Sequence, residues 1–239
     1  MPNVLIDKLS RRDLLNAEEV ADLEQAVEPT QIVPAGQDLV RQHQRPTHST
    51  LLLSGFCARY ATLDDGGRQL TEINVMGDFV DLHSFLMQPM DHGVLTLTSC
   101  EISRVPHGAL RHITERHPHL TRLLWLDTLI DAAIHRQWLV GMGRRSGLGR
   151  FAHLLCELHV RLEVVGQVED HTFELPLTQP ELGDAMGLSA VHVNRLLAEL
   201  RRDRLVQWLG PQVRILDWER LVRIAEFDPS YLRLGPAPL

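Results

Sequence analysis

The stretch from residue 189 to 195 carries side chains able to recognise the edges of base pairs. Arg195 can make a bidentate contact to guanine, and Asn194 can pair with adenine or with a phosphate. His192 could do either, and Val191 could lie against a thymine methyl group. Hydroxyl groups at helix N-termini are suited to phosphate contacts. The candidate DNA-contacting residues are Thr178, Gln179, Ser189, Val191, His192, Asn194 and Arg195.

Two short predicted helices position these side chains. Thr178 and Glu181 form the Thr-x-x-Glu pattern of a capping box, and Gly187 ends that helix. Ser189 caps a second helix, so the pair has the form of a helix-turn-helix. A helical hairpin that binds nothing shows the same local pattern. Residues 205–208 and 212–216 predict a following β-hairpin, which is typical of the wing of a winged helix and favours DNA binding. Asp217 then caps a last predicted helix.

The first half of the chain has a different pattern. A short helix is predicted around residues 14–27 and ends before Pro29. Short apolar runs at residues 50–53, 56–60, 69–73 and 94–98 predict strands, and the turn at residues 64–67 contains an Asp-Gly pair. These strands indicate a small β-barrel or jelly roll over residues 30–106.

A long helix without internal Gly or Pro is predicted to follow Pro118 and to end before Gly141. Apolar positions in it step by three and four residues, as in the a and d positions of a coiled coil. A long core helix of a monomer is the alternative, but the two-sided apolar surface favours a parallel homodimer. The expected dimer contacts are Leu123, Leu126, Ile130, Ala133 and Ile134.

Composition narrows the class of protein. The chain has 239 residues, a formal net charge of −7, and three scattered cysteines that predict neither a disulfide framework nor a metal site. Residues 1–140 hold 12 basic and 18 acidic side chains, whereas residues 190–216 have a basic excess of three. No apolar run is long enough to span a bilayer, and the start does not resemble a signal peptide, so we expect a cytoplasmic protein that does not bind membranes. No nucleophile–base pattern or phosphate loop indicates an enzyme.

The predicted fold class is α+β: an N-terminal barrel or jelly roll, a dimerisation helix and a C-terminal winged helix-turn-helix. We expect a sensor domain over residues 1–116, the dimerisation helix over 117–141 and a hinge over 142–147. A DNA-binding domain over residues 148–228 and a tail over 229–239 complete the chain.

This order of elements resembles the Crp–Fnr superfamily of bacterial transcription regulators over about residues 30–216. The run from Thr178 to Leu200 and the Gly77-Asp78-Phe79 sequence at the entry to that superfamily's phosphate-binding cassette carry the resemblance. It implies a homodimer that reads a palindromic operator in double-stranded DNA, contacts RNA polymerase and responds allosterically to an effector bound in the barrel. The superfamily's usual base-reading Glu falls at Val191, whereas its Arg is retained as Arg195.

The cassette departs from the pattern of members that bind cyclic AMP. Asp81 stands in place of a Gly, Leu82 in place of the Glu that holds the ribose, and His92 in place of the Arg that pairs with phosphate. Leucine cannot accept from a hydroxyl and a neutral imidazole is a poor phosphate ligand, so we expect another effector or ligand-independent activity. The candidate effector-pocket residues are Gly77, Asp78, Phe79, Asp81, Leu82, His83, His92 and Gly93.

Other sensor chemistries stay open or are disfavoured. Iron–sulfur members carry N-terminal cysteines, and none precedes Cys57. The stretch 78–84 resembles the part of the haem-containing carbon-monoxide sensor that supplies a histidine ligand, so a haem-based gas or redox sensor using His83, with Pro2 as a further resemblance, is an alternative. The simpler interpretation is that His83 is hydrogen-bonded within the cassette and binds no haem. We predict no other metal site: the histidines at 107, 112, 117 and 119 do not share a helix face and are expected to be solvated. A DNA-binding protein without sequence preference is a further alternative.

Overall fold

The computed structural model describes residues 4–235 and begins with two short helices, α1 (Val4–Ser10) and α2 (Ala17–Ala26). The Asn16 side chain caps α2 by accepting hydrogen bonds from the backbone N–H groups of Glu18 and Glu19. The sequence predicted α2 but missed α1, because seven residues are too few to show a helical period. Buried Leu5 and Leu9 nevertheless anchor α1 in the core.

Two antiparallel sheets form the β domain. One has the strand order β1 (Gln31–Val33), β7 (Cys100–Pro106) and β3 (His48–Ser54). The other has the order β2 (Asp38–Val40), β6 (Gly93–Thr96), β4 (Cys57–Thr62) and β5 (Arg68–Asn74). Apolar side chains from both sheets, among them Leu52 and Val94, meet in one buried cluster. The predicted β domain is confirmed, although β1, β2 and β7 were not foreseen.

The three cysteines are buried, and all are free. β4 and β7 bring the sulfur atoms of Cys57 and Cys100 to 3.7 Å from each other, which their positions in the sequence did not indicate.

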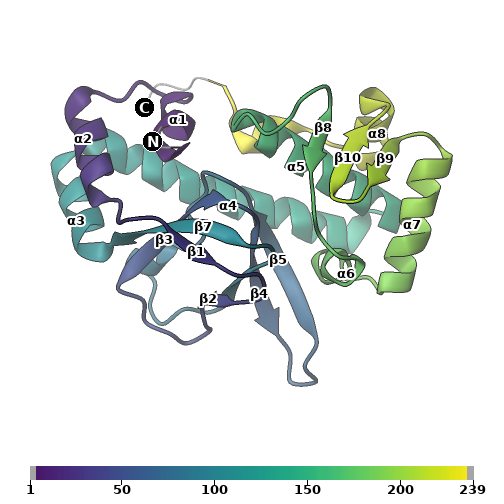
Figure 1. The fold of residues 1–239 in the computed structure, drawn as a ribbon, viewed down its shortest axis with the longest axis horizontal. Helices are drawn as coiled ribbons and strands as arrows, with labels where there is room; N and C mark the ends of the chain where they lie inside the picture. Colours follow the sequence, from purple (N-terminus) through teal and green to yellow (C-terminus); the bar gives the residue numbers. More distant parts are fainter. Residues whose placement is uncertain (1–3, 236–239) are drawn as a thin grey trace.

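A short helix, α3 (His107–Arg116), leads into α4 (Pro118–Arg144), which spans the molecule between the N-terminal helices and the C-terminal domain (Figure 1). At 1.5 Å per residue, α4 is about 40 Å long. Its 27 residues extend beyond the expected end at residue 141. Glycine costs only about 1 kcal/mol in a helix, so Gly141 and Gly143 do not interrupt it. Only Arg145 and Ser146 separate α4 from α5 (Gly147–Val164), which is a shorter break than the expected hinge over residues 142–147.

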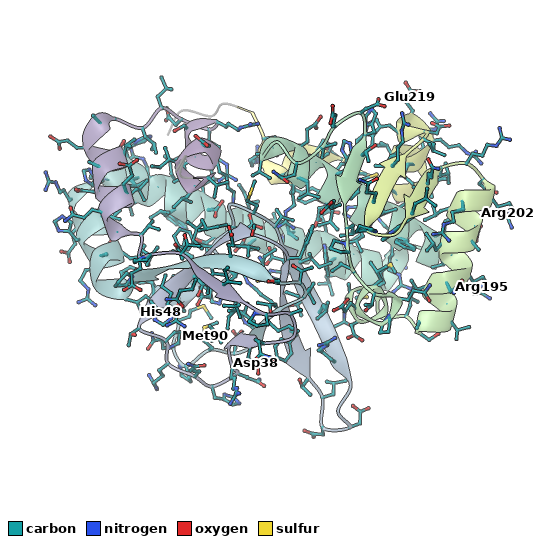
Figure 2. The ribbon with its side chains drawn as sticks, viewed as in Figure 1. Asp38, His48, Met90, Arg195, Arg202 and Glu219 are labelled. Carbon is teal, nitrogen blue, oxygen red and sulfur yellow. The ribbon has the colours of Figure 1, made fainter. Side chains whose placement is uncertain are left out.

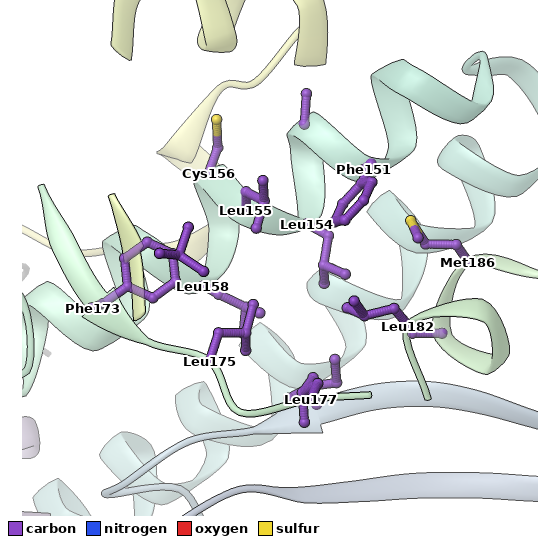
Figure 3. Close-up of a cluster of buried hydrophobic side chains, with 14 of the residues drawn as sticks. Phe151, Leu154, Leu155, Cys156, Leu158, Phe173, Leu175, Leu177, Leu182 and Met186 are labelled. Atoms are coloured by element: carbon purple, nitrogen blue, oxygen red, sulfur yellow. The ribbon is translucent and has the colours of Figure 1, made fainter. Parts of the chain in front are cut away.

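The C-terminal domain contains α5 and a three-stranded sheet with the order β8 (Thr172–Glu174), β10 (Gln212–Ile215) and β9 (Val206–Leu209). Three helices complete it: α6 (Gln179–Met186), α7 (Ala190–Arg202) and α8 (Trp218–Ala225). Figure 3 shows the core between α5, β8 and α6, where Phe151, Leu155 and Leu175 are fully buried. The predicted helix-turn-helix and the following β-hairpin are both present.

The segment expected to be a tail is packed onto this domain in its described part. A 3-10 helix, η2 (Pro229–Leu232), buries Leu232, and the Tyr231 hydroxyl donates to Glu157 Oε2 at 2.7 Å. Tertiary contacts with α5 therefore order residues 229–232, which show no strong local pattern.

No helix within residues 4–235 has the length and apolar character needed to cross a membrane.

Titration of His153 in the core beneath α8 should affect stability. Burial lowers the pKa of His153 to about 4, while the unfolded value is about 6.5. The unfolded chain therefore binds more protons between these values, and stability is lost as the pH falls from about 6.5 to 4. We predict that His153→Phe makes the free energy of unfolding less dependent on pH in this window, as measured by urea denaturation. His112→Phe, at a largely exposed histidine, should leave the slope unchanged; equal slopes for all three proteins would contradict the assignment.

Candidate nucleic-acid interface and sensor pocket

The N-termini of α6 and α7 are capped as their sequences predict. Thr178 Oγ1 accepts from the Glu181 N–H at 3.3 Å, and Glu181 Oε2 accepts from the Thr178 N–H at 2.7 Å. Gly187 ends α6 with a φ of 62°, in the left-handed region that glycine adopts without a steric penalty. Ser189 Oγ then accepts from the His192 N–H at 3.3 Å. These local interactions set the turn that holds α7 against α6.

One face of α7 is open to solvent, and the other is buried. Val193, Leu196 and Leu200 pack into the domain core. Val191 is 82% exposed, and Arg195 projects outward from the helix, as Figure 2 shows. An apolar side chain so fully exposed at the start of a helix is available for contact with another molecule.

Four other candidate DNA contacts are partly engaged within the chain. His192 is half-buried, and its ring lies beside Gly147 at the start of α5. The Thr178 hydroxyl donates to Glu181 at 2.7 Å, and this carboxylate at the start of α6 would repel a phosphate. Gln179 Oε1 accepts from Asn194 Nδ2 at 3.3 Å, which ties Asn194 to α6. The roles of Thr178 and His192 stay predictions, and Ser189, Val191, Asn194 and Arg195 are exposed.

Several arginines between residues 190 and 216 have hydrogen-bond or ion-pair partners within the chain. Arg201 donates to the Trp208 carbonyl at 2.7 Å, Arg202 pairs with Asp203, and Arg214 pairs with Asp170. Within residues 4–235, Arg195 has no ion-pair partner. It is therefore the basic side chain on α7 best placed to bind a base or a phosphate.

Asp78, expected in the effector pocket, lies instead in a buried ion-pair network. Its two carboxylate oxygens accept from Lys8 at 2.8 Å and from Arg161 at 2.7 Å. Burial alone would raise the pKa of Asp78, but these two cations hold it well below its usual value. Asp78 is thus a structural anion that joins α1 to α5, and it is not free to bind a ligand.

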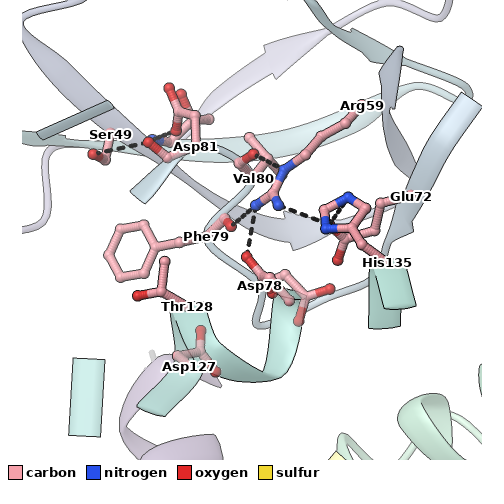
Figure 4. A network of polar contacts seen from close by, with 12 residues as sticks. Ser49, Arg59, Glu72, Asp78, Phe79, Val80, Asp81, Asp127, Thr128 and His135 are labelled. Atoms are coloured by element: carbon pink, nitrogen blue, oxygen red, sulfur yellow. Dashed lines mark hydrogen bonds and ion pairs between the residues drawn. The ribbon is translucent and has the colours of Figure 1, made fainter. Parts of the chain in front are cut away.

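The network continues through the β domain and α4 (Figure 4). Arg59 pairs with Glu72 at 2.7 Å and with Asp131 of α4 at 2.8 Å. Asp127, one turn earlier in α4, pairs with Lys8 and Arg12. Burial raises the pKa of Glu72 to about 8 despite its pairing with Arg59. These contacts fix the β domain, α1 and α4 together.

Three more of the predicted pocket residues are part of the interior. Phe79 and Leu82 lie in the apolar cluster with α1 and α4. Asp81 is fully buried and accepts from the Thr50 N–H at 2.5 Å, and burial raises its pKa to about 7. The resemblance of the cassette predicted that these residues surround a ligand, but in this chain they are part of the buried core.

Three further pocket residues, His83, His92 and Gly93, do come together. Gly77 lies apart from them, where a Cβ on it would be 3.5 Å from Lys8 and from Val165. The imidazole rings of His83 and His92 have their centroids 4.9 Å apart. A Cβ on Gly93 would lie 2.4 Å from the Tyr60 ring, so only glycine allows this close approach. Tyr60 is held there by donating its hydroxyl proton to Asp38 at 2.7 Å. Pro2, the second residue of the haem resemblance, lies outside the described residues.

The prediction that the histidines between residues 107 and 119 are solvated is wrong for His117. This side chain is buried and pairs with Asp22 at 2.7 Å. His119 is also partly buried and lies 2.9 Å from Glu19. Both histidines fasten α2 to the start of α4, which the sequence separation of about 100 residues concealed.

The expected dimer contacts need correction, because the structure buries three of them inside their own chain. Leu123, Ile130 and Ile134 face the core and expose 6% or less of their surface. Leu126 and Ala133 are half-buried. The apolar side chains that α4 leaves exposed are Trp125, Leu129, Leu139 and Val140, at 65%, 51%, 72% and 47%. Trp125 and Leu129 also line a groove with Leu86 and Met87.

Comparisons with known proteins give consistent results. Residues 30–117 match the cyclic nucleotide-binding domain, and residues 149–224 match the Crp-like helix-turn-helix domain. The transcriptional activator protein FnrL of Cereibacter sphaeroides is 28% identical over 218 residues, covering 89% of this chain and 86% of that protein. The nitrogen fixation regulation protein FixK of Bradyrhizobium diazoefficiens is 26% identical over 196 residues, covering 80% and 79%. The solved structure of FixK2 from Bradyrhizobium japonicum has a TM-score of 0.73 at 19% identity, covering 82% of this chain and 96% of that one, and shows the same fold.

The buried ion pairs predict a large effect of Arg161→Met on stability. This change leaves Asp78 with Lys8 as its remaining ion-pair partner and removes a cation from beside Glu157. Breaking a buried pair on one side costs about 3–5 kcal/mol, and urea denaturation should show a loss of this order. Arg202→Met, at an exposed pair that water screens, should cost far less. Similar losses for the two variants would contradict the structural role of Asp78.

Proposed function

Because the chain belongs to the Crp–Fnr superfamily of DNA-binding transcription regulators, which are not enzymes, we propose that it acts as a homodimer whose paired α7 helices read a palindromic operator. The exposure of Arg195 on the open face of α7, without an internal ion-pair partner, is the observation that carries the proposal. As the resemblance implies, we extend the proposal to RNA polymerase as a protein partner.

The open face of α7 supports sequence-specific recognition in the major groove. Arg195 is suited to guanine, because a guanidinium can donate to both O6 and N7 of that base. Val191 offers an apolar surface for a thymine methyl group. Asn194 is exposed and fixed by Gln179, so it can add a base or phosphate contact. A protein without sequence preference would not need side chains placed so specifically toward base edges.

The side chains that α4 leaves exposed, among them Trp125, Leu129 and Leu139, form a row along one side of the helix. This exposed row supports a parallel homodimer with a seam different from the one predicted. Its positions step alternately by four and three residues, which keeps them on one face of a coiled coil. The corrected seam consists of Trp125, Leu129, Ala132, Arg136, Leu139 and Gly143. A partner helix on this face would cover apolar side chains that are otherwise in contact with water.

Control through the β domain is supported by direct contact with the helix-turn-helix. Arg68 of β5 pairs with Asp184 of α6 at 2.7 Å, and Gln69 Nε2 donates to the Asp184 carbonyl at 2.6 Å. Arg150 of α5 donates to the Met186 carbonyl at the end of α6 at 2.7 Å. A change in the β domain can therefore act on α6 directly, besides acting through α4, and alter the spacing of the two α7 helices.

Arg195→Ala should lower affinity for the operator by about 1–3 kcal/mol and relax the preference at one guanine in each half-site. Fluorescence anisotropy with a selected palindrome and with single-base variants measures both effects. Arg223→Ala, on α8, is the control and should leave the base preference unchanged. An unaltered operator preference in Arg195→Ala would contradict the proposal, and equal affinity of the unmodified protein for scrambled DNA would indicate non-specific binding.

The corrected seam predicts opposite outcomes for two leucines of α4. Leu129→Asp should weaken dimerisation roughly tenfold or more, a loss of about 1.4 kcal/mol, because it places charge on the exposed row. Leu123→Ala should instead lower the free energy of unfolding by about 2–5 kcal/mol, because it opens a cavity in the core. Analytical ultracentrifugation and urea denaturation separate the two effects; dimerisation unaffected by Leu129→Asp would contradict the seam.

A further inference from the structure

Two imidazoles in the β domain have nitrogen atoms without hydrogen-bond partners. Nε2 of His83 and Nε2 of His92 are both buried, and neither has a partner within the part of the chain that the structure describes. The two residues lie on either side of the segment 86–91, which is exposed except for the buried Met90. They belong to different elements, since His83 lies in the 3-10 helix η1 (Leu82–Phe85) and His92 precedes β6. Buried polar atoms are almost always satisfied, so this pair points to a ligand.

Asp91 completes the cluster. Its Oδ1 atom lies 2.7 Å from Nδ1 of His92, which places the proton of that ring on Nδ1 and leaves the lone pair of Nε2 free. The Asp91 side chain is 68% exposed and can move to bring an oxygen toward the two rings.

The distances suit an ion that draws the three side chains together. One potential ligand atom from each of His83, Asp91 and His92 lies within 4.8 Å of the others. In a tetrahedral site with metal–ligand bonds of about 2.0–2.1 Å, the ligand atoms lie about 3.3 Å apart. A small movement of the 86–91 loop and of the Asp91 side chain would therefore close the site.

The surrounding charge permits a cation. Arg59 is the buried cation that acts on both His83 and His92, and it is paired with Asp131 at 2.8 Å. The Glu72 carboxyl, 2.7 Å from Arg59, adds to this compensation only when it is ionised, because burial raises its pKa to about 8. Asp91 adds a further negative charge at the edge of the cluster. A dication would thus enter a region without a net positive charge from these groups.

We propose that His83, His92 and Asp91 bind a borderline divalent transition-metal ion such as Zn²⁺ or Co²⁺. Two imidazoles and one carboxylate are a donor set that these ions accept, and water or an external ligand would fill the remaining position.

The site is placed to act on the dimer helix, an extension that rests on the proposed function. His83, Phe85 and Leu86 line the same groove as Trp125 and Leu129 of the exposed row of α4. An ion that joins η1 to the start of β6 would restrict η1 and hence the wall of this groove. Metal binding should therefore change the packing of the two α4 helices.

Titration of the purified, chelator-treated full chain with Co²⁺ tests the site. We expect one ion per chain and the intense visible absorption of Co²⁺ in a site of low coordination number. His83→Gln and His92→Gln should each weaken binding at least about tenfold, and Asp91→Asn, at an exposed residue, should weaken it as well. His112→Gln, on α3, is the matched control and should bind like the unmodified protein.

Three results would overturn the site: no saturable binding, binding unchanged in His83→Gln and His92→Gln variants that retain the circular dichroism of the unmodified chain, or equal loss in His112→Gln. A Soret band in the untreated protein that disappears in His83→Gln would also overturn it and would assign His83 to haem.

DNA affinity measured with and without Co²⁺ tests the regulatory extension separately. We expect the ion to change operator affinity by about fivefold or more in the unmodified protein and not in His92→Gln. Saturable metal binding without an effect on DNA affinity would overturn only this extension. Metal binding in a chain that binds no DNA under either condition would contradict the proposed function and leave the site in place.

Discussion

The carboxylate of Asp78 is the point on which the arrangement of the two domains depends. It is buried between Lys8 of α1 and Arg161 of α5, and Lys8 also pairs with Asp127 of α4. An uncompensated buried charge costs several kcal/mol, so any arrangement that separates these helices from the β domain must hydrate or re-pair the charges. The network therefore favours one relative placement of α1, α4, α5 and the β domain, whereas apolar contacts alone would tolerate sliding between them.

Local interactions explain why the helix-turn-helix could be predicted and the sensor pocket could not. The caps Thr178, Glu181 and Ser189 act within three residues of their partners, so their spacing in the sequence carries the structure. Asp78 and Lys8, in contrast, are 70 residues apart, and no local pattern links them. The cassette sequence suggested a ligand-binding role for Asp78 and Asp81, but pairing and burial with distant groups gave both a structural role.

The dimer seam illustrates a second limit of pattern analysis. α4 carries two apolar rows, and both have the three-and-four spacing of a helix packed against a neighbour. Periodicity detects each row but does not show which of the two rows packs against the rest of the same chain. The row containing Leu123 and Ile130 packs against α1 and the C-terminal core, so the row containing Trp125 and Leu129 stays exposed and is the one proposed for the dimer contact. Only the tertiary structure distinguishes the two.

The contact between β5 and α6 couples the β domain and the helix-turn-helix in both directions. Arg68 and Gln69 hold the helix that supports α7, so any displacement of α6 on an operator must break or strain these bonds to the β domain. Free-energy coupling between two binding sites is equal in both directions. On the proposed function, the operator would thus itself act as an effector of the β domain: base sequences that require different placements of α7 would give the same protein different affinities for whatever the β domain binds.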